Sequence, residues 1–319
     1  MSSNSLLAAS NSAEHENHSG QRRVMWKDLP NEIILDIVAG AAEFDFAMIQ
    51  SLQLVDRRLY NILKAYERSL CRGYAANQLL RIIPCFPDII SPQCGACGNV
   101  GCASGLSFSL LAEIQRRSRI VTTLLRQVFS LAPVCCCAQS WYQLFEVGTL
   151  LLYRLQERCD YDSKVSFITS MPLHALVAIF ITLMQSVRAA QNGGIGLIHQ
   201  DLQPEDPSVR SDIHLVFEDL ILESGPEFVL AILNQDERAD HALRLKYATL
   251  DEAQMHNPDG SPPRKSFISQ LKRAFATQAG CRIGEVMSKA MALAGTKPLR
   301  NLDEAGVVDL VRFDDRRDE

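Results

Sequence analysis

The sequence predicts an all-α protein. Apolar residues recur at helical spacing from Trp26 onward, strand-like alternation is almost absent, and no internal repeat of fixed period indicates a solenoid. Of the 319 residues, 47% are hydrophobic and 22% are charged, which provides enough apolar side chains to fill a core and excludes a wholly disordered chain. We expect a three-helix unit followed by an irregular multi-helix domain.

Residues 1–23 are rich in Ser, Asn, Glu and His without a period, and we expect a disordered tail. Their apolar run, residues 6–9, is too short for an export signal, and no basic segment precedes it. The most apolar stretch, residues 173–184, is shorter than the ~20 residues that span a bilayer. We therefore expect an intracellular protein of the cytoplasm or nucleus without a membrane partner. A net charge of -5 gives no global attraction for nucleic acid.

Three helices are expected between residues 24 and 70. Pro30 suits the first position of a helix, where an N–H group needs no partner, and Glu32 follows in the first turn, where the helix dipole favours an acid. Asp45 is a candidate N-cap of the second helix. The apolar stripes of the three helices are Ile33, Ile34, Ile37, Val38 and Ala41; Phe46, Ile49 and Leu52; and Val55, Leu59, Ile62, Leu63 and Tyr66. Since so small a unit buries only part of its apolar surface, part of the first stripe should face another protein or the rest of the chain.

The remainder of the chain is divided by composition. We expect a helix and a Cys/Gly-rich loop at 71–105, a helical domain at 106–256, a Pro-rich linker at 257–265 and C-terminal helices at 266–319. The expected helices cover 106–130, 139–158, 172–191, 212–223, 226–256, 265–294 and 302–312, with a loop at 84–105 and a break at 192–211.

The ten cysteines leave two interpretations open. Cys94 and Cys97 have the spacing of half a zinc site, and Cys102 and Cys85 would complete four ligands. No second pair follows at a usual spacing, so we favour free thiols and expect no metal or other cofactor. Metal analysis of the purified protein decides between the two. The adjacent cysteines at 135–137 are better explained as small apolar residues at a helix start.

Residues 198–206 resemble a protein-kinase catalytic loop. Gln200 and Gln203 replace its Arg and Lys, and Phe180 stands where a phosphate-binding lysine should follow Val-Ala-Ile. A Gly-rich phosphate loop at the required distance is also missing. We interpret the segment as a polar loop and expect no catalytic residues, hence no enzyme.

Residues 26–70 resemble an F-box. The F-box pattern has Leu-Pro-x-Glu-Ile at the start of helix one, then hydrophobic pairs, then Leu-x-x-Val-x-Arg-Arg leading into helix three. The matching positions are Leu29, Pro30, Glu32, Ile33, Ile37, Ile49, Leu52, Val55, Arg57 and Leu59. The connection between Val38 and Ile49 looks slightly longer than usual, and Leu59 stands where an aromatic residue is common.

The resemblance implies a docking role. An F-box binds the Skp-family adaptor of SCF (Skp–cullin–F-box) ubiquitin ligases, and through it the cullin, while the rest of the chain presents a substrate protein that the sequence does not name. The resemblance is to F-box proteins of filamentous fungi that lack a propeller or leucine-rich repeats. We expect Arg57 and Arg58 at the rim or in solvent. The adaptor-binding residues that the F-box resemblance implies are Leu29, Pro30, Ile33, Ile37, Leu52 and Val55. The alternative is a non-catalytic helical scaffold unrelated to ubiquitin.

Overall fold

The computed structural model of the chain describes residues 29–42, 46–79, 81–90, 106–131, 138–202, 206–249 and 264–313. Within these ranges the protein is all-α, as expected, with 15 α-helices and no strand. The helices are α1 (Asn31–Ala42), α2 (Phe46–Gln53), α3 (Arg57–Gln78), α4 (Pro87–Ile90), α5 (Phe108–Leu131), α6 (Ala138–Gln156), α7 (Tyr161–Ser170), α8 (Leu173–Gly193), α9 (Pro207–Ser224), α10 (Pro226–Leu233), α11 (Glu237–Ala248), α13 (Phe267–Ala279), α14 (Val286–Ala294), α15 (Lys297–Arg300) and α16 (Glu304–Val311). Short 3-10 helices are η2 (Ile83–Cys85), η3 (Gly196–Ile198), η4 (Gln200–Leu202) and η5 (Ile283–Glu285).

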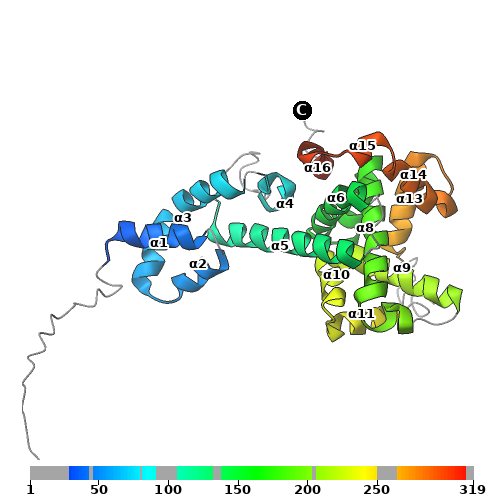
Figure 1. Ribbon diagram of the computed structural model, residues 1–319, viewed down its shortest axis with the longest axis horizontal. Helices are drawn as coiled ribbons and strands as arrows, with labels where there is room; N and C mark the ends of the chain where they lie inside the picture. Colours follow the sequence, from blue (N-terminus) through cyan, green and yellow to red (C-terminus); the bar gives the residue numbers. More distant parts are fainter. Residues whose placement is uncertain are drawn as a thin grey trace, which may run out of the picture.

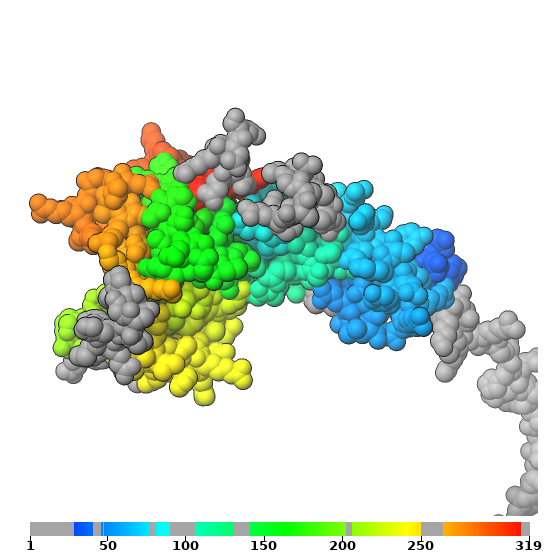
Figure 2. Space-filling model, turned by 180° about the vertical axis from the view of Figure 1, so that it is seen from behind, coloured from blue at the N-terminus to red at the C-terminus, as the bar shows by residue number. Residues whose placement is uncertain are grey.

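The molecule has a small unit and a larger bundle, which are joined by one long helix. Helices α1, α2 and α3 pack together at one end, and α5 runs from them into the bundle formed by the later helices (Figure 1). Seen from behind, the three-helix unit projects from the bundle along the direction of α5 (Figure 2). The N-terminal unit therefore has surfaces that the bundle does not cover.

The core of the bundle is built around α8. This helix packs against α6 along most of its length and also contacts α5, α10, α13 and α14. It is the one helix among the described residues that is long and apolar enough to cross a membrane, with a mean hydropathy of 1.6 in its most apolar window. Because 78% of that window is buried inside the protein, its place in the core explains its apolar composition.

Two of the predicted helices are each broken in two. Where the structure describes it, up to residue 249, the predicted helix 226–256 forms α10 and α11, separated by a turn in which Gln235 has a φ of 62° and Asp236 caps α11. The predicted helix 265–294 is α13 and α14, separated after Gly280, which ends α13 with a left-handed φ of 61°. Apolar residues on both sides keep a helical spacing across each break, and for that reason the periodicity alone missed them.

Other boundaries also differ from those predicted. The third helix of the N-terminal unit begins after its N-cap, Asp56, and continues unbroken to Gln78, so residue 70 is not the end of an element. The predicted loop at 84–105 begins with η2 and α4, and η3 and η4 occupy part of the break predicted at 192–211. Helices α7 and α15 were not predicted. The expected tail at 1–23, Asp45 and residues 257–263 of the linker lie outside the described residues.

Glu218 on α9 is an acid buried in the bundle. The residue is 8% exposed, and burial raises the pKa of its carboxyl to about 7. The charge of Lys272 lowers this pKa but offsets only part of the increase. In the unfolded chain the carboxyl titrates near 4.5, so the folded protein holds a proton that the unfolded chain releases between those pH values. The free energy of unfolding should therefore fall as the pH rises from 4.5 to 7.

We expect Glu218→Gln to remove this loss of stability. At pH 8 the variant should be more stable than the wild type by roughly 1–3 kcal/mol, because each pKa unit corresponds to about 1.4 kcal/mol. At pH 4.5 the two should differ little. Urea denaturation at several pH values measures this, with the exposed Asp212→Asn on the same helix as a control. Parallel stability–pH curves for the wild type and Glu218→Gln would contradict the prediction.

Candidate docking surface on the N-terminal helices

The first helix divides its apolar residues between the core and the surface. Ile34 and Val38 are 1% and 0% exposed. Their preceding neighbours in the sequence, Ile33 and Ile37, are both 45% exposed. The inward pair joins a core that includes Phe46 from α2. Because residues four apart lie on one face of a helix, Ile34 and Val38 form a buried stripe along α1, and Ile33 and Ile37 form a separate exposed stripe.

Arg58 fixes the start of α1 against the start of α3. Its Nη2 atom donates a hydrogen bond to the carbonyl oxygen of Leu29 at 2.8 Å and another to Oδ1 of Asn31 at 3.0 Å. The side chain is half-buried and hydrogen-bonded within the chain, so Arg58 is not fully solvated, whereas Arg57 is exposed. The expected place of both residues at an interface rim stays a prediction. A single hydrogen-bonded guanidinium positions both helix starts, a role that the sequence pattern does not indicate.

The turn between α2 and α3 is unusually apolar for an exposed segment. Leu54 is 88% exposed and Val55 is 71% exposed, immediately before the Asp56 N-cap, whose side chain accepts a hydrogen bond from the backbone N–H of Arg58. Since Arg58 also donates a hydrogen bond to Leu29, the start of α3, which directly follows this turn, lies within one side-chain length of the start of α1. We define the N-terminal apolar surface as Pro30, Ile33, Ile37, Leu54 and Val55.

The three-helix unit is firmly attached to α5. The backbone N–H of Phe46 donates to Oε1 of Gln115 at 3.0 Å, and the N–H of Phe108 donates to Oε1 of Glu67 at 3.0 Å. The Phe46 ring packs edge-on against Tyr74, with ring centroids 4.5 Å apart. The two partly buried hydrogen bonds link α2 and α3 to α5, and the ring contact joins α2 to α3, so that the N-terminal apolar surface keeps a fixed direction relative to α5.

The six residues that the F-box resemblance implies fall into two groups. Pro30, Ile33, Ile37 and Val55 are exposed, whereas Leu29 and Leu52 are half-buried and pack against the core. The two leucines therefore contribute more to the packing of the three-helix unit than to an exposed contact surface. Leu54, the most exposed large apolar residue of the described chain, was missed, because the F-box pattern leaves its position unspecified.

Of the four cysteines of the candidate zinc site, the structure describes only Cys85. Cys85 is half-buried, and burial raises the pKa of its thiol to about 11. No group of three or more potential ligands gathers among the described residues, while Cys94, Cys97 and Cys102 lie outside them, as do residues 135–137.

The described part of the kinase-like segment forms η3 and η4. Ile198 is fully buried there, and Nδ1 of His199 accepts a hydrogen bond of 3.3 Å from the backbone N–H of Asp201. Asp206, at the end of the segment, is the N-cap of α9, with its carboxylate accepting from the backbone N–H of Ser208 at 2.8 Å. The side chains of His199 and Asp206 thus stabilise the local backbone.

Comparisons of the chain with protein-family models, with curated proteins and with solved structures find no match. The case for a function therefore depends on the F-box-like pattern of residues 26–70 and on the exposure of the N-terminal apolar surface.

Proposed function

We propose that this chain is the F-box substrate-receptor subunit of an SCF-type ubiquitin ligase, and that the N-terminal apolar surface binds the Skp-family adaptor. The observation that carries the proposal is the exposure of Ile33 and Ile37, each 45% exposed on a helix whose other apolar stripe is buried. Exposed apolar residues on one face of a helix, in a small unit that also has an exposed apolar turn, are typical of a protein interface.

The energetics favour an apolar anchor with a charged border. Completely burying an Ile, Leu or Val side chain contributes on the order of 1.5–3 kcal/mol, and Ile33, Ile37, Leu54 and Val55 would all lose water in such a contact. Charged residues beside them, such as Glu32 on α1, are exposed and would contribute less each.

The proposed role is to position another protein. The adaptor would bring the cullin and the ubiquitin-charged enzyme, while the bundle after α5 would hold the substrate protein. Ubiquitin transfer is then favoured because the substrate lysines are held at a high effective concentration, so the chain needs no catalytic residue of its own. Helix α5 suits this role, since its N-terminal part contacts the three-helix unit and its C-terminal part lies in the bundle.

The double variant Ile33→Ser, Ile37→Ser tests the proposal. Because both side chains already contact water, the fold should persist, and we expect at least a hundredfold weaker binding to a purified Skp-family adaptor in a calorimetric titration. The matched control is Leu245→Ser, Ile283→Ser, which removes two equally apolar side chains that are 59% and 53% exposed in the bundle. This control should bind the adaptor as the wild type does.

Two results would overturn the proposal. Undiminished adaptor binding by the Ile33, Ile37 variant would place the contact elsewhere. A wild-type chain that fails to bind the adaptor would favour the non-catalytic scaffold without a link to ubiquitin. Circular dichroism of each variant shows whether its helix content is retained.

A further inference from the structure

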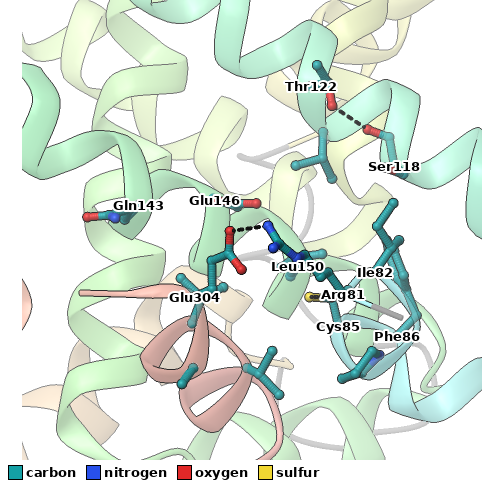
Figure 3. Close-up of a pocket in the computed structure, with 15 residues that line it drawn as sticks. Arg81, Ile82, Cys85, Phe86, Ser118, Thr122, Gln143, Glu146, Leu150 and Glu304 are labelled. Carbon is teal, nitrogen blue, oxygen red and sulfur yellow. Dashed lines mark hydrogen bonds and ion pairs between the residues drawn. The ribbon is translucent and has the colours of Figure 1, made fainter. Parts of the chain in front are cut away.

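A pocket of about 360 Å³ opens between the bundle and the segment that follows α3. Its walls come from the segment around η2, from the middle of α5, from α6 and from α16 (Figure 3). Apolar side chains form most of the lining, among them Ile82, Phe86, Val121, Leu150 and Val308. A volume of this size is at the lower end of the range that ligand pockets have, and it suits one long side chain with its neighbours.

The charged groups of the pocket leave one carboxylate uncompensated. Arg81 and Glu304 form an ion pair at 3.0 Å in which both side chains are largely exposed. Glu146 on α6 also lines the pocket, yet no hydrogen bond or ion pair joins its carboxylate to any residue in the described part of the chain. Burial, reinforced by the nearby Glu304, raises the pKa of its carboxyl, as is expected of a charge without a partner. A bound cation would supply that partner.

We propose that this pocket binds a lysine or arginine side chain of a substrate protein, presented in a peptide segment with apolar neighbours. The methylene groups of such a side chain match the apolar walls, and its charged end would pair with Glu146. The walls beside Ile82 and Val308 would take the apolar neighbours of the basic residue.

This assignment extends the proposed function and rests on it, because the bound segment belongs to a substrate only if the chain is a substrate receptor. Val121 of the pocket and Phe108, which contacts the three-helix unit through Glu67, both lie on α5. Thirteen residues of helix separate them, a rise of about 20 Å. A peptide in the pocket would therefore lie at a fixed distance from the N-terminal apolar surface, as presentation of a substrate requires.

The test uses the full chain without any adaptor, so that its outcome does not depend on adaptor docking. The probe is the blocked peptide Gly-Leu-Lys-Leu-Gly, titrated by calorimetry at low salt, against the same peptide with norleucine in place of lysine. We expect at least tenfold weaker binding of the norleucine peptide, and at least tenfold weaker binding of the lysine peptide to Glu146→Gln. The control Glu237→Gln, an exposed acid on α11, should bind the lysine peptide as the wild type does.

Three outcomes would overturn the proposal. The first is equal binding of the lysine and norleucine peptides, which needs no variant and so stays informative if Glu146→Gln is unstable. The second is unchanged binding by a folded Glu146→Gln. The third is n-butylammonium binding as tightly as the peptide, which would assign the pocket to small amines. Adaptor binding that fails while peptide binding holds would refute the ubiquitin role and leave the pocket assignment standing.

Discussion

Replacement of Arg154 by alanine is expected to lower the free energy of unfolding by about 3–5 kcal/mol. The residue is 3% exposed, and its Nε atom donates to Oδ2 of Asp88 at 2.7 Å. Its Nη1 atom donates to the carbonyl oxygen of Val311, and the guanidinium lies over the rings of Phe167 and Phe313. Alanine would leave a partly buried carboxylate and a carbonyl without this donor, where α4, α6 and α16 meet.

The matched control is Arg81→Ala. Arg81 also joins the segment around η2 to α16, through its ion pair with Glu304, but the two side chains are 82% and 77% exposed. Because water screens such a pair, the expected loss is about 0–1 kcal/mol. Urea denaturation of both variants measures the difference, and equal losses would show that the buried contacts of Arg154 do not hold these segments together.

Gly148→Ala is expected to destabilise the bundle by roughly 2–3 kcal/mol. Helices α6 and α8 approach so closely at this glycine that an added Cβ would overlap Oγ1 of Thr182 and lie 2.5 Å from the carbonyl oxygen of Ala178. Since the second atom belongs to the backbone of the central helix, relief requires the two helices to move apart.

Gly73→Ala on α3 provides the control for helix propensity. Nothing lies within 4 Å of a Cβ added there, so alanine should stabilise the helix by about 0.5–1 kcal/mol. Opposite signs for the two glycines, measured by thermal or urea denaturation, are the expected result. A stabilised Gly148→Ala would mean that α6 and α8 are not in close contact at this point.

The sequence predicts the fold class well because helical spacing follows directly from which residues are buried. Helix boundaries inside long apolar stretches are harder to predict. Gln235 and Gly280 break helices with single residues of positive φ, while the apolar spacing continues on both sides. In the sequence, Gly148 stands out only for the low helix propensity of glycine, although its lack of a side chain is what allows α6 to approach α8.

The candidate sites are only partly accessible to sequence reasoning. The apolar spacing within residues 26–70 suggests that α1 has more apolar residues than one contact needs, but this spacing does not tell which of Ile33 and Ile34 faces outward; only the F-box resemblance singles out Ile33. That choice depends on where α2 and α3 pack. Arg58 forms hydrogen bonds with residues far away in the sequence, and Glu146 shares a pocket lining with the distant Glu304. No local pattern indicates either arrangement.

Hydrogen–deuterium exchange of the full chain, alone and with a purified Skp-family adaptor, tests the central claim most directly. If the N-terminal apolar surface is covered by the adaptor, the amides of α1 and of residues 54–58 should exchange more slowly in the complex, while those of α11 keep their rate. Slower exchange confined to the bundle, or unchanged exchange in α1 at saturating adaptor, would contradict the account.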